Sequence, residues 1–318
     1  MRNKKLYKIG LFGMEQSKIK FLKKKFKNIK FLSLNKRNLE KNYDLNSIIV
    51  FTEGSYKNWI DNFFLNRKYE YFKNLRWFHL SRAGTDKFND VIKNLKFSVT
   101  SGKNIQAPNV SEHCIAILLY LSRRLNFSNN KKKLLMYRPI ELYKKSVLVF
   151  GCGGVGQSIA QKLNSFGMEV SIAVRKKTKL PFRPKKFYKN QDLKKIVSKF
   201  DVLINAASLN KSTKNLFNKK IFSRMKKNSI FINISRGECV KTNDLLYYLR
   251  KGKFLGVGLD VIDKETLSKN HPIRKFPNFL YTSHTAGWSD TLHRRFKLIV
   301  DNITKFSNKG TLINLVKN

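Results

Sequence analysis

The amino-acid sequence predicts an α/β protein made of two doubly wound, parallel-sheet domains with a cleft between them. Short apolar segments typical of buried strands alternate with longer segments whose apolar residues recur at helical spacing. This alternation is found twice, once before and once after residue 146. Because helical crossovers join parallel strands, each series predicts its own parallel sheet. Ligands commonly bind between two such domains, so the cleft is the expected ligand site.

The first series predicts strands at 6–13, 31–35, 47–52 and 76–81, with a helix over 17–27. The turn residues Ala83 and Gly84 follow the last of these strands. A long apolar helix is then predicted over 109–125, and Ser111 is a plausible N-cap for it.

The second series begins at Ser146 and has the continuous apolar segments that fully buried parallel strands require. The predicted strands are 147–150, 170–174, 201–207, 229–235, 255–261 and 279–283, and the predicted helices include 157–166 and 291–306. The chain length of 318 residues accommodates two domains of ordinary size.

The formal charge of +46 comes from 66 basic residues, most of them lysines, and 20 acidic residues. Such an excess alone predicts a protein that binds polyanions. However, the lysines are dispersed, and asparagine is also abundant, as A/T-rich codons would cause. We therefore interpret most of the lysines as a solvated surface and expect no specific nucleic-acid partner. A polyanion-binding protein remains one alternative.

Three cysteines at positions 114, 152 and 239 form no metal-binding or disulfide pattern, and the histidines show no metal-ligand spacing. We therefore expect no metal. No apolar stretch reaches the ~20 residues that cross a bilayer, and the first residues lack the apolar core of a signal peptide. These features predict a cytoplasmic protein without a membrane partner.

A glycine-rich turn follows the predicted strand at 147–150 and opens the next helix. It reads Gly151-Cys152-Gly153-Gly154-Val155-Gly156, which is G-x-G-x-x-G in the context of a Rossmann-like dinucleotide-binding domain. Gly151 allows the tight turn, Gly153 allows backbone to approach a pyrophosphate, and Gly156 allows helix and strand to pack closely. The free N–H groups at the start of the helix, from Gly154 and Val155 onward, favour phosphate.

The residues after the next strand predict which dinucleotide binds. An NAD enzyme usually has a carboxylate there that accepts a hydrogen bond from the ribose 2′-hydroxyl. This chain instead has Arg175 and Lys176, cations that favour a 2′-phosphate. We therefore expect NADP(H) to be preferred, with NAD(H) possible.

Several further motifs occur in a fixed order along nearly the whole chain. They are SRAGTDKF (81–88), NVSEHCIAILLYLSRR (109–124), FGMEV (166–170), MKKNSIFINISRGECVKTNDLL (225–246), GVGLDVIDKETL (256–267) and SHTAG (283–287). In this order the chain resembles the D-isomer-specific 2-hydroxyacid dehydrogenases. The resemblance implies an oxidoreductase that transfers hydride between a nicotinamide cofactor and a small 2-keto or 2-hydroxy acid.

The resemblance also implies roles for individual residues. Arg236 would bind the substrate carboxylate and carbonyl, and His284, paired with Glu265, would act as acid/base. The backbone N–H groups of Ala83 and Gly84 would bind the substrate carboxylate from the other domain. Other positions that would contact the cofactor are Ala207, Ile234 and Asp260, the last near the nicotinamide carboxamide.

By the same resemblance, residues 1–103 form the substrate-binding (catalytic) domain and 104–284 the NAD(P)-binding domain. Residues 285–318 return to the substrate-binding domain. The expected reaction is NADP(H)-dependent reduction of a glyoxylate- or hydroxypyruvate-class 2-keto acid, and the expected assembly is a homodimer. The alternatives are another family member, of the phosphoglycerate or lactate type, and a non-catalytic dinucleotide-sensing interaction protein.

The chain departs from the family pattern at several loop positions. Ser283 precedes His284 where proline is usual, and Thr266 follows Glu265 where proline is again usual. Losing a proline removes a constraint on the loop. No acting side chain is missing, so the departures predict looser loops and not lost chemistry.

Overall fold

The computed structural model describes residues 7–35, 48–51, 60, 63–71, 74–85, 89–127, 129–136, 138–176, 178–263, 267–290 and 292–316. The chain divides into two compact units, one of residues 1–105 with 290–318 and one of 106–289. We call them the five-stranded unit and the seven-stranded unit after their sheets. The boundaries expected from the sequence, after 103 and after 284, lie slightly nearer the amino terminus than these divisions.

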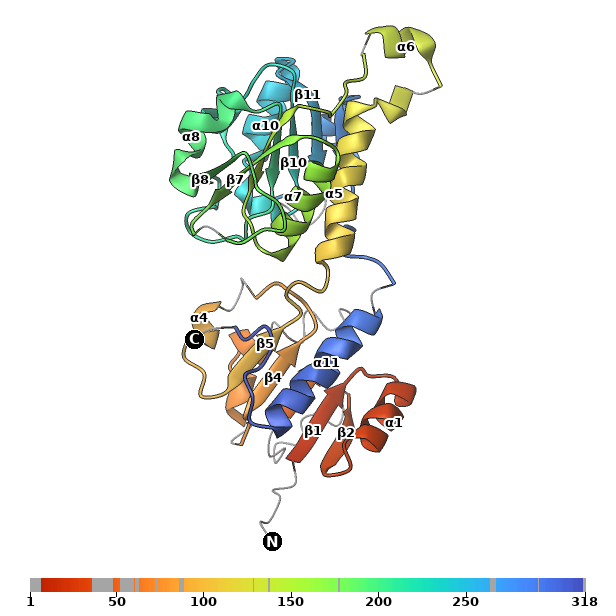
Figure 1. Ribbon diagram of the computed structural model, residues 1–318, viewed down its shortest axis with the longest axis vertical. Helices are drawn as coiled ribbons and strands as arrows, with labels where there is room; N and C mark the ends of the chain where they lie inside the picture. The colour runs from red at the N-terminus through yellow and green to blue at the C-terminus, as the bar shows by residue number, and fades with distance from the viewer. Residues whose placement is uncertain are drawn as a thin grey trace. The chain divides into compact units, whose positions relative to one another are not determined.

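The five-stranded unit holds one parallel sheet of strand order β2-β1-β3-β4-β5 (Figure 1). Its elements are β1 (Tyr7–Phe12), α1 (Gln16–Lys25), β2 (Ile29–Leu34), β3 (Ile48–Phe51), a 3₁₀ turn (Lys68–Tyr71), β4 (Trp77–Leu80), α4 (Asn89–Ile92), β5 (Ser98–Ser101) and α11 (Leu292–Ser307). Helix α11 buries Ile299 and Ile303 in the same cluster as Trp77 of β4, and the ring of Phe306 stacks on Trp77. Helix α11, near the end of the chain, thereby completes the core of the unit that residues 1–105 form.

The seven-stranded unit holds a second parallel sheet, of order β12-β11-β10-β9-β6-β7-β8. Its first half comprises α5 (Ala107–Ser122), a 3₁₀ turn (Leu125–Phe127), α6 (Lys131–Met136), β6 (Ser146–Phe150), α7 (Gly154–Ser165), β7 (Glu169–Val174), β8 (Lys186–Lys189), a 3₁₀ turn (Asn190–Asp192), α8 (Leu193–Ile196) and a 3₁₀ turn (Val197–Lys199). Its second half comprises β9 (Val202–Asn205), α9 (Lys219–Phe222), β10 (Ser229–Asn233), a 3₁₀ turn (Gly237–Cys239), α10 (Thr242–Arg250), β11 (Phe254–Leu259), a 3₁₀ turn (Pro272–Lys275) and β12 (Phe279–Tyr281).

The strand order of the larger sheet determines where its ligand site lies. The chain runs outward from β6 through β7 to β8, and then returns to place β9 on the other side of β6. At such a switch point ligands commonly bind beside the carboxyl ends of the strands. The expected fold class, α/β with doubly wound parallel sheets, is thus confirmed.

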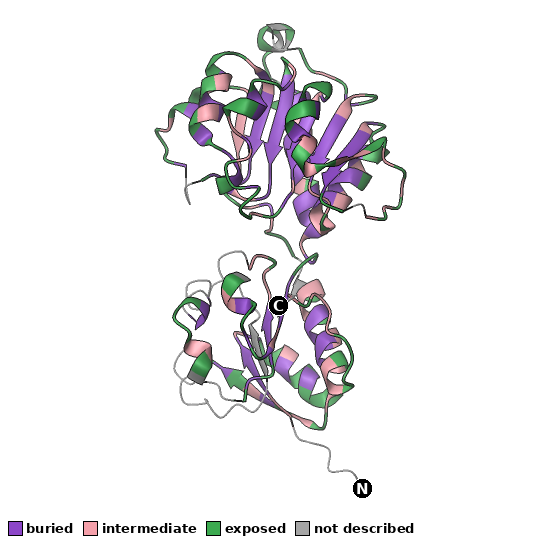
Figure 2. Cartoon of the chain, turned by 90° about the vertical axis from the view of Figure 1, so that its left-hand side faces the viewer, coloured by how far each residue is buried: buried purple, intermediate pink, exposed green. Residues whose placement is uncertain are grey.

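Both faces of this sheet are covered, so its central strands are buried on both sides. All the residues of β9 and β10 are buried, and two apolar clusters, one on each face, pack against the helices. Figure 2 shows the buried residues concentrated in the strands and the exposed residues on the outer surfaces of the helices. This burial explains the continuous apolar segments in the sequence.

The predicted N-cap of helix α5 is wrong. Helix α5 begins at Ala107, after Gln106, and Ser111 therefore lies inside the helix and does not cap it. Its hydroxyl donates to the Pro108 carbonyl at 2.7 Å and lies 2.8 Å from the hydroxyl of Ser158 on α7. The helix can begin earlier because proline is tolerated in the first helical turn, where its missing N–H removes no hydrogen bond.

Candidate active site

The glycine-rich turn between β6 and α7 requires glycine at two positions for steric reasons. Gly151 has a φ of +94°, and a Cβ there would lie 2.5 Å from Cα of Ala207. A Cβ at Gly156 would lie 2.1 Å from the carbonyl oxygen of Gly151. Neither position accepts a side chain, because each contact is with backbone that cannot move independently.

Gly153 differs from its neighbours because a Cβ there would meet no atom within 4 Å. It is the residue that precedes α7, in an extended conformation, and the first N–H groups of α7 follow it. These N–H groups have no acceptor within the helix. The turn therefore has open space beside a helix N-terminus, the arrangement that a bound pyrophosphate requires.

The end of β7 carries the two cations that the cofactor prediction depends on. Arg175 and Lys176 are both exposed and follow Val174 directly, whereas Lys177 lies outside the described residues. The amide of Gln157 donates to the Cys152 carbonyl at 3.2 Å and reaches Thr178 Oγ1 at 3.5 Å. This contact joins the segment that carries the cations to the glycine-rich turn.

Two buried asparagines, at the ends of β9 and β10, hold the next two loops together. The Asn205 amide donates to Asn233 Oδ1 at 2.9 Å, and both side chains are completely buried. Asn205 Oδ1 accepts from the N–H of Ala207 at 3.2 Å, while Asn233 Oδ1 accepts from the N–H of Ser235 at 3.2 Å. The sequence reasoning did not identify these asparagines. A polar residue that ends an apolar strand, in DVLIN and in SIFIN, is the signal that could have found them.

The loop that carries Arg236 is packed as tightly as the glycine-rich turn. The Arg236 carbonyl accepts from the Asn233 amide at 2.9 Å, and its guanidinium donates to the Ser235 carbonyl at 2.9 Å. A Cβ at Gly237 would lie 1.7 Å from the carbonyl oxygen of Ile262. Glycine is therefore required after Arg236, because here the loop lies against the segment that follows β11.

Asp260 follows β11 directly and is almost fully buried. Its carboxylate Oδ1 accepts hydrogen bonds from Thr282 Oγ1 at 2.6 Å and from the N–H of Thr285 at 2.9 Å. The N–H of Ala286 reaches both carboxylate oxygens, at 3.2 and 3.3 Å, and the Asp260 carbonyl accepts from the N–H of His284 at 2.6 Å. The main chain and the side chain of one residue thus hold the whole turn after β12.

That turn contains two consecutive left-handed residues that are not glycine. The φ angles are +49° at Ser283 and +60° at His284. This conformation costs an ordinary residue roughly 1–2 kcal/mol, so two in succession persist only where the surroundings hold them. Proline, whose ring keeps φ near −65°, could not adopt the φ of Ser283. Serine therefore stands at position 283, where the family usually has proline, with a backbone conformation that proline would not allow.

The parallel arrangement collects the predicted residues of the seven-stranded unit at one edge. They follow the carboxyl ends of six strands: Gly151 after β6, Arg175 after β7, Ala207 after β9, Ile234 and Arg236 after β10, Asp260 after β11 and His284 after β12. Glu265 lies in 264–266, outside the described residues. Ala83 and Gly84 lie in the five-stranded unit, in the loop after β4, with Ala83 exposed and Gly84 half-buried.

Two further findings concern the described part of the chain. It contains no group of three or more His, Cys, Asp or Glu side chains placed to hold a metal ion. It also contains no helix that combines the length and the apolar character needed to cross a membrane.

Comparisons with known proteins agree with this geometry. Residues 115–286 match a family model described as the NAD binding domain of D-isomer specific 2-hydroxyacid dehydrogenases. The human glyoxylate reductase/hydroxypyruvate reductase is 28% identical over 225 residues, which are 67% of this chain and 67% of that protein. A 2-ketogluconate reductase of Gluconobacter oxydans is 28% identical over 251 residues, 76% of this chain and 78% of that protein.

A solved structure agrees in fold over almost the full length. A D-isomer specific 2-hydroxyacid dehydrogenase family protein from Aeromonas salmonicida has a TM-score of 0.78 at 24% identity, covering 97% of this chain and 98% of that chain. The chain therefore belongs to the D-isomer specific 2-hydroxyacid dehydrogenase family, as its motifs indicate. It is an oxidoreductase with an NAD(P)-binding domain, which the glycine-rich turn and its open space fit.

Proposed function

We propose that this protein reduces a small 2-keto acid of the glyoxylate or hydroxypyruvate class to a D-2-hydroxy acid, with NADPH as the preferred reductant. The observation that carries the proposal is the collection of Arg236, Asp260 and His284 at the edge that also holds the glycine-rich turn. The names of the relatives support the substrate class, because two curated glyoxylate reductase/hydroxypyruvate reductases, human and mouse, match at 28% and 29% identity.

In this proposal the residues at the edge divide the chemistry between them. A nicotinamide held beside Ala207, Ile234 and Asp260 would supply the hydride for C2 of the substrate. Arg236 binds the substrate carboxylate and polarises the carbonyl through its planar pair of donors. His284 donates a proton to the carbonyl oxygen as negative charge develops there, and Glu265 orients the imidazole and favours its protonated form.

The remaining predicted residues bind substrate and cofactor in the same proposal. Residues 1–103 supply the N–H groups of Ala83 and Gly84 to the substrate carboxylate, residues 104–284 bind the cofactor, and residues 285–318 complete the substrate-binding domain. We assign the pyrophosphate to the turn at 151–156. The nicotinamide half is assigned to Ala207, Ile234 and Asp260.

The deciding experiment is a panel of 2-keto acids assayed with NADPH and with NADH. The rate is measured as the loss of reduced-nicotinamide absorbance. We expect the highest kcat/KM with glyoxylate or hydroxypyruvate and NADPH. A preference for pyruvate or for a phosphorylated hydroxypyruvate would instead favour another family member. Cofactor binding without turnover of any 2-keto acid would contradict the enzyme proposal and favour a dinucleotide-sensing protein.

The cofactor preference has its own test at Arg175. A carboxylate at this position would repel a 2′-phosphate and accept a hydrogen bond from a 2′-hydroxyl, so Arg175→Asp should raise the NADH-to-NADPH ratio of kcat/KM. Lys199→Asp makes the same charge change at an exposed position near the opposite edge of the sheet and serves as the control. An Arg175→Asp ratio equal to that of the control would contradict NADP(H) preference.

We also propose a homodimer that forms through α5 and the extension after it. Leu125 and Leu135 expose 50% and 73% of their surface, and Figure 1 shows α6 standing away from the rest of its unit. Exposed leucines on a projecting segment are typical of a surface that a partner covers. Leu135→Asp should shift the mass measured by light scattering toward the monomer, whereas Leu65→Asp, exposed on the other unit, should not.

A further inference from the structure

Three side chains on one face of the α5 segment contact the turn that carries His284. Gln106 precedes the helix, and Asn109 and His113 follow at spacings of three and four residues, which place all three on the same side. The Gln106 amide donates to the Gly287 carbonyl at 3.0 Å, and the Asn109 amide donates to the Ala286 carbonyl at 3.2 Å. His113 Nε2 lies 2.8 Å from Thr282 Oγ1. Helix α5 therefore supports this turn from 282 to 287.

The hydrogen-bond directions in this network are determined by the single proton of the threonine hydroxyl. Thr282 Oγ1 donates its proton to Asp260 Oδ1 at 2.6 Å. It must then accept from His113, so His113 carries a proton on Nε2. His113 Nε2 is also 3.6 Å from Asp260 Oδ1. The result is a directed chain from His113 through Thr282 to Asp260, whose carboxylate holds the N–H groups of Thr285 and Ala286.

This chain of hydrogen bonds explains how the turn keeps its unfavourable backbone. Ser283 and His284 are both left-handed, and each would relax toward an ordinary conformation if released. The restraints bracket the pair, with Thr282 before it and Thr285 and Ala286 after it. Without the His113–Thr282 contact, the Thr282 hydroxyl and the Asp260 carboxylate that it binds would be held less firmly.

We propose that His113 and Thr282 are positioning residues for the His284 imidazole, because they hold the left-handed backbone of Ser283 and His284 in place. The inference rests on the proposed function of His284 as acid/base. Neither residue needs to touch substrate. Their effect reaches the reaction through the backbone of Ser283 and His284, so it should alter proton transfer more than cofactor binding.

Matched variants separate positioning from packing. Thr282→Val removes the hydroxyl at nearly constant volume, and Thr282→Ser retains it. His113→Leu removes the ring donor, and His113→Gln retains an N–H donor at similar reach. We expect Thr282→Val and His113→Leu to lower kcat by roughly tenfold to a hundredfold, as misplaced catalytic groups do. The conservative variants should recover most of the rate, and the dissociation constant of NADPH should stay near that of the wild type in all four.

A second measurement tests the inference without turnover. The imidazole C–H resonance of His284, assigned by its absence in His284→Asn, is titrated by NMR in the full-length protein with NADPH bound. Its pKa should move in Thr282→Val and in His113→Leu and return in Thr282→Ser and His113→Gln. If the wild type reduces no 2-keto acid, the proposed function fails while this titration still decides whether the network positions His284.

Three results would overturn the inference. The first is that Thr282→Val and His113→Leu keep the kcat and the His284 titration of the wild type. The second is that the conservative variants lose as much activity as the disruptive ones, which would indicate general packing. The third is that kcat and NADPH affinity fall together, which would make α5 a support of the cofactor site and not of His284.

Discussion

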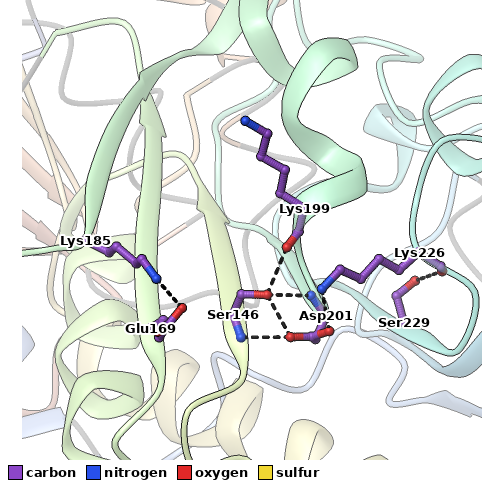
Figure 3. A network of polar contacts seen from close by, with 7 residues as sticks. All are labelled: Ser146, Glu169, Lys185, Lys199, Asp201, Lys226 and Ser229. Carbon is purple, nitrogen blue, oxygen red and sulfur yellow. Dashed lines mark hydrogen bonds and ion pairs between the residues drawn. The ribbon is translucent and has the colours of Figure 1, made fainter.

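The strands of the seven-stranded sheet all begin at one edge, the amino edge, and all end at the opposite one, the carboxyl edge. The two edges stabilise their polar groups in different ways. At the amino edge, Ser146 and Asp201 are joined by several hydrogen bonds. Asp201 Oδ2 accepts from the Ser146 N–H at 2.9 Å and from the Ser146 hydroxyl at 2.7 Å. The N–H of Asp201 in turn donates to the Ser146 carbonyl at 2.9 Å. Lys226 Nζ forms an ion pair with Asp201 Oδ1 at 2.8 Å, and Figure 3 shows all three residues together.

At the carboxyl edge the hydrogen bonds hold loops in conformations that the chain would otherwise avoid. Ser283 and His284 both have positive φ, and the Asp260 carboxylate holds the turn that contains them. The contacts of the amino edge join β6 to β9 and β10 and are complete without a ligand, whereas the carboxyl edge retains open space at Gly153. Positive φ does not separate the two edges, because Lys144 before β6 and Asn228 before β10 are also left-handed. The comparison teaches that open space beside a helix N-terminus, more than the number of polar contacts, distinguishes the functional edge from the structural one.

The largest expected effect comes from removing the acid/base itself. His284→Ala should lower kcat by roughly 10²–10⁴, because general acid catalysis of the reduction is lost. The dissociation constant of NADPH, followed by fluorescence, should stay unchanged, since the glycine-rich turn is intact. Asp201→Asn at the amino edge is the control and should keep full kcat. Retained activity in His284→Ala would show that the acid lies elsewhere.

The next effect tests whether the left-handed turn is required. Ser283→Pro introduces the residue that the family usually carries, yet proline cannot adopt a φ of +49°. We expect kcat to fall roughly tenfold to a hundredfold through misplacement of His284. Ser283→Gly, which allows positive φ, should retain most of the activity. If Ser283→Pro is as active as the wild type, the reaction does not need the turn in this conformation.

At the amino edge the expected loss is in stability and not in rate. Burial alone would raise the pKa of Asp201, but hydrogen bonds from Lys226 and Ser146 outweigh it, so the pKa lies below its ordinary value. Asp201→Asn should lower the free energy of unfolding by about 1–3 kcal/mol, the usual contribution of a hydrogen-bonded charge. Urea denaturation gives this value.

The same measurement has a matched control and a predicted pH dependence. Glu169→Gln removes the exposed pair with Lys185 and should change stability by no more than about 1 kcal/mol. Because the folded pKa of Asp201 is lowered, its contribution is present above its ordinary pKa of 3.8 and is lost as the pH falls through the folded value. The prediction fails if the two variants are equally stable at neutral pH.

The prediction with the smallest effect at neutral pH tests whether a buried polar group near a carboxyl edge is necessarily functional. His79 lies on β4 of the other sheet, with Nδ1 2.8 Å from Thr100 Oγ1 and Nε2 buried without a partner among the described residues. Burial lowers the pKa of His79 from 6.5 to about 3. The unfolded chain therefore takes up a proton first as the pH falls, and stability should decrease between pH 6.5 and about 3.

Within this range the protonation of the unfolded chain at His79 should lower the free energy of unfolding by about 1.4 kcal/mol per pH unit. His79→Gln should flatten the slope by that amount, whereas His293→Gln, at an exposed position, should leave it unchanged. Activity above pH 6.5 should be that of the wild type in both. A slope that His79→Gln does not alter would show that another group accounts for the loss.

The sequence by itself was sufficient for the fold class, the family and most of the strands. Fully buried parallel strands such as β9 and β10 must be continuous apolar segments, so they are visible without the structure. Strand β8 was not predicted because it reads KFYK and is only partly buried at the end of the sheet. Strand β5 was not predicted because Thr100 and Ser101 are buried despite being polar.

Local residue patterns also determined the glycine positions, because a positive φ and a Cβ clash are properties of a few residues close in space. What only the tertiary structure decided is how distant segments meet. His113 and Thr282 are 169 residues apart, and Asn205 and Asn233 are joined only because β9 pairs with β10. No local pattern encodes a hydrogen bond between segments that the packing of α5 and the order of the strands bring together, since such a bond depends on the register of both.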